Sequence, residues 1–277
     1  MTSRFSETAS AWIRIARGGA FVLGSCIVLT ACTANASVPG TSSTSSTTST
    51  STTTTLGLSQ PNAQKPITIL DVGDSLGEDL GIGLEDTLGT SPIVHVVQAA
   101  VGDTGLARPD YYNWPAHLAA DLAKYHPQLV TILVGGNDAQ SFDADNQVVV
   151  FGSTLWHTIY TGRVAVMMSE VLKAHARLLW VGLPIMANTT FAASMATLNA
   201  IYKSEAALHR GVEFMPTWSL FSNSEGQFST YLTNSSGQSV LARDPDGIHL
   251  AVPGGCDIAA VATIKDAERI WHIRLGV

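Results

Sequence analysis

The sequence is poor in charged residues, and in basic residues most of all. Only 13% of the 277 residues are charged, with 15 Lys and Arg against 22 Asp and Glu, which gives a formal net charge of −7. A nucleic-acid-binding protein usually carries a basic face that neutralises phosphates, and a cluster of Lys and Arg is needed to attract anionic lipid. The composition therefore disfavours a nucleic-acid partner, and any membrane association would need a covalent anchor.

Cysteine is scarce as well. Cys26 and Cys32 lie close to the N-terminus and Cys256 lies close to the C-terminus, which excludes a disulfide within one domain and a cysteine-based metal site. We expect Cys256 to be a small buried residue on a helix. The histidines show no paired spacing of the His-x-x-x-His kind, and neither a Gly-x-Gly-x-x-Gly motif nor a Walker-type loop is present. We therefore predict no metal and no cofactor, and we disfavour a nucleotide-binding domain.

A hydrophobic run long enough to span a membrane is also missing. The apolar stretch from Gly18 to Thr30 has 13 residues and follows three arginines; a transmembrane helix needs about 20, whereas a signal peptide needs fewer. The stretch ends in Leu29-Thr30-Ala31-Cys32, which resembles the bacterial lipobox, in which the cysteine is lipidated and becomes the new N-terminus. We predict a signal peptide over 1–32, lipidation of Cys32 and a position at the outer face of the cell membrane. The alternative is a freely secreted form, cut after Ala36.

A low-complexity segment follows this leader. Residues 41–55 are all Ser or Thr, and a segment with almost nothing apolar to bury cannot offset the entropy lost on ordering. We predict a disordered tether over 33–65 and a single domain over 66–277.

From residue 66 onward, apolar strands alternate with helical patterns. Strands are expected at 67–72, 93–98, 128–134, 178–183 and 212–216, and helices at about 76–88, 115–125, 153–176, 192–209 and 255–273. Near-continuous apolar strands are typical of a parallel sheet covered on both faces. The alternation predicts an α/β three-layer sandwich around a central, mostly parallel five-stranded sheet, with its ligand site at the carboxyl ends of the strands.

Four short motifs fall at those strand ends or before the last helix. Gly73-Asp74-Ser75-Leu76 follows the first strand, Gly102 follows the second, and Gly135-Gly136-Asn137-Asp138 follows the third. Asp246-Gly247-Ile248-His249 stands before the final helix. A serine at a helix start is presented beside free backbone amides, an asparagine amide can donate to an oxyanion, and an aspartate can orient a histidine base. Each motif alone could equally be an ordinary turn.

Together and in this order, the motifs resemble those of the SGNH (GDSL-type) hydrolase family. The first motif is an intact GDSL, and the last fits Asp-x-x-His. The intervening sequence is similar to a bacterial envelope subgroup of undetermined substrate. The resemblance implies the flavodoxin-like fold of that family, with Ser75 as nucleophile, His249 as base and then acid, and Asp246 as its orienting carboxylate. It also implies an oxyanion hole made by the Ser75 and Gly102 amides and the Asn137 side chain, with Gly105 as the alternative to Gly102.

The resemblance further implies chemistry on esters. We expect a serine esterase that acts on small O-acyl esters, and an exported domain makes carbohydrate of the cell envelope a plausible substrate. An O-acyltransferase and a non-catalytic envelope-binding protein remain as alternatives. Tyr111, Trp114 and Gln140 lie close to the Gly102 and Asn137 motifs, and we predict that they contact substrate; for the aromatic pair, packing against the following helix is the alternative.

Overall fold

The computed structural model describes residues 57–276. The expected signal peptide (1–32), the lipidation site Cys32 and most of the expected tether (33–65) lie outside these residues. Within the described part of the chain, none of the helices combines the length and the apolar character that crossing a bilayer would require.

Two residues near the end of the expected tether, Leu58 and Gln60, contact the domain, although most of residues 57–65 are exposed. Leu58 packs against the hydrophobic core. The side chain of Gln60 hydrogen-bonds to the carbonyl of His272 and accepts a bond of 3.1 Å from the amide of Arg274. Leu58 and Gln60 supply the apolar and amide contacts that a run of Ser and Thr lacks.

Five parallel strands form the central sheet, which confirms the predicted fold class. They are β1 (Ile67–Gly73), β2 (Val94–Gln98), β3 (Leu129–Leu133), β6 (Arg177–Val181) and β7 (Val212–Met215). Their order in the sheet is β2-β1-β3-β6-β7, so the chain reverses direction across the sheet beside β1. In doubly wound sheets, ligands bind at the carboxyl ends of the strands next to such a reversal.

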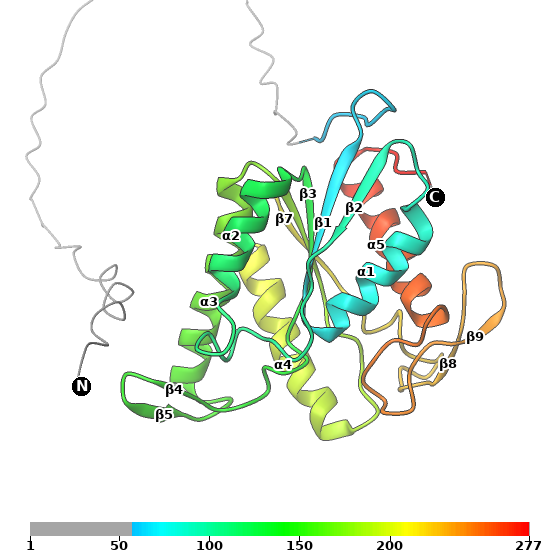
Figure 1. The fold of residues 1–277 in the computed structure, drawn as a ribbon. Coiled ribbons are helices and arrows are strands. Elements are labelled where there is room, and N and C mark those ends of the chain that lie inside the picture. Colours follow the sequence, from blue (N-terminus) through cyan, green and yellow to red (C-terminus); the bar gives the residue numbers. More distant parts are fainter. Residues whose placement is uncertain (1–56, 277) are drawn as a thin grey trace, which may run out of the picture. The chain divides into compact units, whose positions relative to one another are not determined.

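Five helices cover the two faces of the sheet. They are α1 (Ser75–Leu88), α2 (Trp114–Tyr125), α3 (Thr154–Lys173), α4 (Thr189–Ala206) and α5 (Gly254–Trp271). Figure 1 shows α1 and α5 together on one side of the sheet and α2, α3 and α4 on the other. The result is the three-layer arrangement that the alternation of strands and helices predicted.

Four of the helices are preceded by a residue with a short polar side chain that caps the helix. Asp74, Asn113, Ser153 and Asn188 each accept a hydrogen bond from an amide of the first turn of the helix that follows, which satisfies a donor that has no partner within the helix. In α1, leucines four residues apart, Leu76 to Leu88, form one buried face. That face packs on the sheet, so α1 and its first residue, Ser75, are held rigidly against β1.

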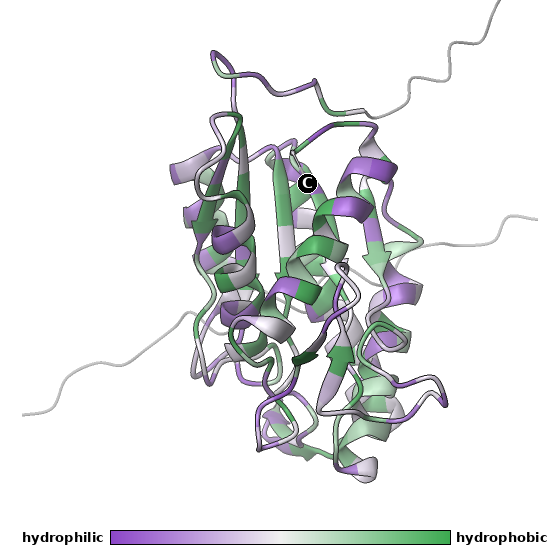
Figure 2. Cartoon of the chain, turned by 90° about the vertical axis from the view of Figure 1, so that its right-hand side faces the viewer, coloured by the Kyte–Doolittle hydropathy of each residue, from purple (hydrophilic) through white to green (hydrophobic). Residues whose placement is uncertain are grey.

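The hydrophobic core lies between the sheet and the helices. Figure 2 shows hydrophobic residues concentrated along the strands and hydrophilic residues on the outer turns of the helices. The tryptophans Trp114, Trp156 and Trp180 are among the largest fully buried side chains. Cys256 on α5 is buried and free, as predicted.

Two hairpins were not predicted from the sequence. They are β4 (Phe142–Ala144) with β5 (Gln147–Val149), and β8 (Tyr231–Thr233) with β9 (Ser239–Leu241). In Figure 1 both hairpins lie toward the end of the molecule where the carboxyl ends of the sheet strands are found, on opposite sides of it. Each strand has only three residues, which is too short for a periodic pattern to show.

Candidate active site

Ser75 lies where β1 meets α1. It is the first residue of the helix and is half-buried, and an amide at this position has no acceptor within the helix. The preceding Gly73 allows the chain to pass close to β3: a Cβ there would lie 1.9 Å from the carbonyl oxygen of Leu133. Only glycine fits this approach, so the sharp turn that presents the Ser75 hydroxyl follows from the sequence.

The Asp246–His249 loop brings a histidine to this hydroxyl. Nε2 of His249 lies 2.8 Å from Oγ of Ser75, although 174 positions separate the two residues in the sequence. Nδ1 of His249 lies 2.6 Å from Oδ2 of Asp246. The other oxygen of Asp246 accepts the amides of Ile248 and His249, at 2.8 and 3.1 Å. The three predicted triad residues thus form one continuous hydrogen-bonded chain.

The hydrogen bond and the negative charges around His249 favour the protonated form of its imidazole. Burial by itself lowers the pKa of His249, but the hydrogen bond to Asp246 and the negative charges of Asp246, Asp79 and Asp244 outweigh it, so the pKa lies above 6.5. Burial raises the pKa of Asp246, and its hydrogen bonds from His249 and Ile248 bring it below the usual 3.8. Asp246 is therefore ionised at neutral pH and stabilises an imidazolium at His249.

Arg243 organises the same loop, and sequence reasoning missed it. Its fully buried guanidinium donates to the carbonyls of Ile248 at 2.6 Å, His249 at 3.3 Å and Ile185 at 2.5 Å. Burial lowers the pKa of Arg243 to about 10, so the side chain stays charged at neutral pH. A charged donor that binds two successive carbonyls at the histidine fixes the backbone from which the imidazole projects. Its position just before the Asp-x-x-His motif was the only available signal.

Asp79 connects the histidine loop to the serine helix. Its Oδ2 accepts the amide of Leu250 at 2.9 Å, directly after His249. Burial is the largest influence on Asp79 and raises its pKa to about 6. Because Asp79 lies on α1, this bond holds the loop that carries His249 against the helix that carries Ser75.

Asn137 is positioned by Asp74, the residue before Ser75. The buried Oδ2 of Asp74 accepts the amides of Gly135 at 2.8 Å and Gly136 at 2.7 Å, and burial raises the pKa of Asp74 to about 7. The exposed side chain of Asn137 donates one amide hydrogen to the carbonyl of Thr104 at 2.9 Å. An asparagine amide has two hydrogens, and the second has no hydrogen-bond acceptor among the described residues.

Gly102 follows β2, as predicted, but its amide has another partner. It donates to Oε1 of Glu78 at 2.9 Å, so in this structure it is not free to bind an oxyanion. Glu78 lies one turn after Ser75 on α1, and its carboxylate is exposed. Gly105 is buried, with the position of a Cβ only 2.3 Å from a carboxylate oxygen of Asp138, so glycine is required there for packing.

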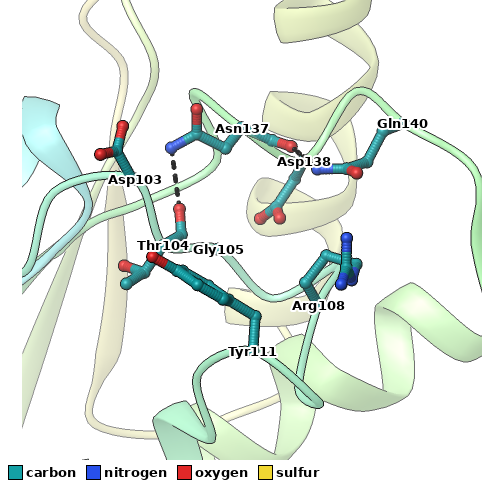
Figure 3. Close-up of a pocket in the computed structure, with 8 residues that line it drawn as sticks. All are labelled: Asp103, Thr104, Gly105, Arg108, Tyr111, Asn137, Asp138 and Gln140. Atoms are coloured by element: carbon teal, nitrogen blue, oxygen red, sulfur yellow. Dashed lines mark hydrogen bonds between the residues drawn. The ribbon is translucent and has the colours of Figure 1, made fainter.

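A pocket of about 240 Å³ opens beside Asn137 (Figure 3). This Asn137 pocket is lined by Asp103, Thr104, Gly105, Arg108, Tyr111, Asn137, Asp138 and Gln140. Two residues predicted to contact substrate, Tyr111 and Gln140, are in this lining. Trp114 is not, and that prediction is wrong: its side chain is 1% exposed and its indole nitrogen donates to Oγ1 of Thr104 at 3.1 Å. Trp114 is the first residue of α2 and belongs to the hydrophobic core.

Within the described residues, no group of three or more His, Cys, Asp or Glu side chains is arranged to hold a metal ion. The polar centre of the site is instead the hydrogen-bonded chain of Asp246, His249 and Ser75. This arrangement can move a proton from a serine hydroxyl to a carboxylate-supported imidazole and back.

Comparison with known proteins gives one family and several solved structures of the same fold. A family model described as "Protein of unknown function (DUF459)" matches residues 68–265. Among proteins with curated descriptions, none matches the chain.

Solved structures share the fold at low sequence identity. A candidate acylhydrolase from Bacteroides fragilis is 17% identical, with a TM-score of 0.53 over 77% of this chain and 92% of that one. A GDSL-like lipase from Bacteroides thetaiotaomicron is 14% identical, with a TM-score of 0.51 over 76% and 92% of the two chains. An acetylxylan esterase from Geobacillus stearothermophilus is 15% identical, with a TM-score of 0.52 over 73% and 94%. Three structures of this esterase are catalytic mutants, in which a serine, a histidine or an aspartate is replaced by alanine.

Proposed function

The chain belongs to the family described as protein of unknown function (DUF459), and from the geometry of its site we propose that it is a serine ester hydrolase acting on small O-acyl esters. Its fold is that of the SGNH hydrolases, as its motifs predicted. One observation carries the proposal: Ser75, His249 and Asp246 are joined by hydrogen bonds of 2.8 and 2.6 Å.

Acylation begins with proton transfer from the serine. Nε2 of His249 takes the proton of the Ser75 hydroxyl as Oγ attacks the ester carbonyl, and Asp246 stabilises the imidazolium that forms. The resulting tetrahedral intermediate carries a negative oxygen. The Ser75 amide and the second amide hydrogen of Asn137 donate to it, and each such donor is worth roughly 10²–10³-fold in rate.

The collapse of this intermediate, and the deacylation that follows it, use the same groups, with His249 first as acid and then as base. The imidazolium of His249 gives its proton to the departing alcohol as the bond between the carbonyl carbon and the alcohol oxygen breaks, which leaves the acyl group on Ser75. Water then attacks the acyl-serine while His249 takes its proton, and a second collapse releases the acid and restores the Ser75 hydroxyl. With a hydroxyl of another alcohol in place of water, the same steps would transfer the acyl group, which is the acyltransferase alternative.

The acetylxylan esterase supports this assignment of roles. In that protein the aspartate and the histidine whose replacement gives catalytic mutants lie three positions apart, which is the spacing of Asp246 and His249. A serine far earlier in that chain is the third such position, as Ser75 is here.

The proposal is tested with p-nitrophenyl acetate. The purified chain should hydrolyse it, and Ser75→Ala and His249→Ala should each abolish the catalysed rate, whereas the exposed Ser224→Ala should keep it. A fluorophosphonate should label the wild type at Ser75 and not the Ser75→Ala variant. Equal rates in all four proteins, or labelling elsewhere, would refute the mechanism and favour a non-catalytic binding protein. Analysis of products with added alcohol separates the acid of hydrolysis from the ester of transfer.

We also propose that the protein is exported and anchored by a lipid on Cys32. The described chain begins beside the C-terminal residues, at the end of the sheet opposite the strand ends that carry the site (Figure 1). An anchor attached through the segment before residue 57 would therefore join the domain at the end away from its site. Metabolic labelling with a radioactive fatty acid should mark the wild type and not Cys32→Ala; equal labelling of both would contradict the anchor.

A further inference from the structure

We propose that the Asn137 pocket binds the alcohol part of the ester, and that this alcohol is an uncharged ring bearing several hydroxyl groups, such as a sugar. The inference rests on the proposed ester hydrolase function and adds to it the substrate class. Four observations carry it: the position of the pocket, the hydrogen-bonding groups left without partners in it, its charge, and the exposed ring of Tyr111.

The pocket adjoins the proposed oxyanion hole. Asn137 is shared by both, and its bond to the carbonyl of Thr104 joins the loop after β3 to the loop after β2. Figure 3 shows Asn137 and Thr104 at one end of the pocket, with the side chain of Arg108 at the other. A group attached to an ester oxygen beside Asn137 can therefore extend into the pocket.

Several polar groups of the lining are already engaged within the protein. The carboxylate of Asp138 accepts the amides of Leu106 and Ala107 and the hydroxyl of Tyr160. The hydroxyl of Thr104 donates to a backbone carbonyl and accepts the indole of Trp114. These groups shape the pocket and leave little capacity for a ligand.

The remaining groups are both donors and acceptors. Five groups of the lining have no hydrogen-bond partner among the described residues. They are one amide hydrogen and Oδ1 of Asn137, Oε1 of Gln140, Nη1 of Arg108 and the carboxylate of Asp103. A hydroxyl group both donates and accepts, so a ring with several hydroxyls can satisfy this mixed set. A fatty acyl chain would leave these groups without partners, which is costly once water is excluded.

The charge of the pocket disfavours an anion. Nε and Nη2 of Arg108 bind Asp110 at 2.9 and 2.8 Å, and the hydrogen bond from Arg108 lowers the pKa of Asp110, which stays ionised. The single cation of the lining is thus neutralised by its neighbour, whereas Asp103 has no basic partner among the described residues. A phosphate or carboxylate on the alcohol would be repelled by Asp103.

Tyr111 offers a flat apolar surface to a ring. Its side chain is 64% exposed, although it is one of the larger hydrophobic residues, and Figure 3 shows its ring along one wall of the pocket. The faces of a sugar ring carry C–H groups that can pack on an aromatic ring. The volume of about 240 Å³ is below the roughly 300–1,000 Å³ of sites for drug-sized ligands, so the pocket has room for one ring.

The test compares acetate release from four acetyl esters that differ in the alcohol. The alcohol part of ethyl acetate is too small to fill the pocket. An O-acetylated methyl glucoside has a neutral ring with several hydroxyl groups. Cyclohexyl acetate has an apolar ring, and an O-acetylated methyl glucuronide has a ring that carries a negative charge. We expect kcat/KM to be highest for the glucoside. Tyr111→Ala should lower that value about tenfold, or about 1.4 kcal/mol, mainly through KM, and should lower kcat/KM for the glucoside more than kcat/KM for ethyl acetate.

Tyr231→Ala is the matched control, because Tyr231 on β8 is equally exposed, at 60%, and does not line the pocket. Tyr231→Ala should leave kcat/KM unchanged for both ethyl acetate and the glucoside. The assignment of the pocket is overturned if kcat/KM for cyclohexyl acetate or for the glucuronide equals that for the glucoside. It is also overturned if Tyr111→Ala lowers kcat/KM for ethyl acetate and for the glucoside by the same factor. If ethyl acetate is not hydrolysed in a manner that depends on Ser75, the proposed function itself fails. If it is hydrolysed but the glucoside gains nothing, only the pocket assignment fails.

Discussion

Glu78→Ala is expected to raise the rate of the proposed ester hydrolysis. In the structure, the exposed carboxylate of Glu78 accepts the amide of Gly102 at 2.9 Å, and this amide is the third donor that the motifs predict for the oxyanion hole. A tetrahedral oxyanion at Ser75 would need the same hydrogen. The carboxylate and the oxyanion therefore compete, and reaction through all three donors requires the bond between Glu78 and Gly102 to break first.

The size of the effect follows from the bond that is lost. A hydrogen bond to a charged group contributes about 1.5–3 kcal/mol. The lower end applies here because Glu78 is exposed and Gly102 is only half-buried. About 1.5 kcal/mol corresponds to roughly tenfold in an equilibrium or a rate. We therefore expect Glu78→Ala to raise kcat/KM by up to about tenfold. Glu78→Gln should give a smaller increase, because its neutral amide oxygen is a weaker acceptor.

The assay is turnover of p-nitrophenyl acetate at a pH where the rate no longer depends on pH, together with the rate of fluorophosphonate labelling of Ser75. The control is Glu85→Ala, which removes the same charge from an exposed position of the same helix and should leave both rates unchanged. Thermal melting verifies that each variant is folded. A folded Glu78→Ala variant with an unchanged or lower rate would refute the competition and remove Gly102 from the oxyanion hole.

Three further predictions concern the histidine and its loop. Because the nearby carboxylates raise the pKa of His249 above 6.5 and only the neutral imidazole accepts the serine proton, kcat/KM should rise with pH through a midpoint above 6.5; a midpoint below that value in a pH series would contradict this. Asp246→Asn should lower kcat roughly 10⁴-fold, as the same change does in well-studied serine proteases, and should lower the midpoint of the pH profile, since a negative charge is lost; a loss of activity without that downward shift would argue against Asp246 as the partner of His249. Arg243→Lys keeps the charge but cannot reach all the carbonyls at Ile185, Ile248 and His249, so urea unfolding should show a loss of about 1–3 kcal/mol and kcat should fall more than KM changes; unchanged stability would show that the carbonyls find other donors.

Much of the fold was predictable because its strands are buried on both faces. In β3, every residue from Leu129 to Leu133 is buried, so the strand reads as one apolar run. The helices are marked by capping residues such as Asp74 and Ser153. The β4–β5 and β8–β9 hairpins escaped prediction because their strands are short and half-polar, and their pairing depends on turn geometry rather than on a buried face.

The aromatic residues near the site show a second limit. Tyr111 and Trp114 are three positions apart and both follow the Gly102 loop. One is exposed at the pocket and the other is buried beneath it. Trp114 begins α2, and its indole finds a buried acceptor in Thr104. The residue types alone did not show which of the two is buried and which is exposed, because tryptophan and tyrosine occur both in cores and at binding surfaces.

The sequence by itself determined the order of the five sheet strands and the five helices, because burial patterns are local and leave their mark on neighbouring positions. It also singled out Ser75, Asp246 and His249 as candidate triad residues, through motifs that resemble those of a known family. Only the tertiary structure decided which groups compete and cooperate around them. The hydrogen bonds from the Gly102 amide to Glu78, from Arg243 to the carbonyl of Ile185 and from the Leu250 amide to Asp79 all join segments that are far apart along the chain. The pocket beside Asn137 is likewise lined by two different loops. Such contacts depend on how the helices and loops pack at the carboxyl edge of the sheet, and no pattern within a single segment encodes that packing.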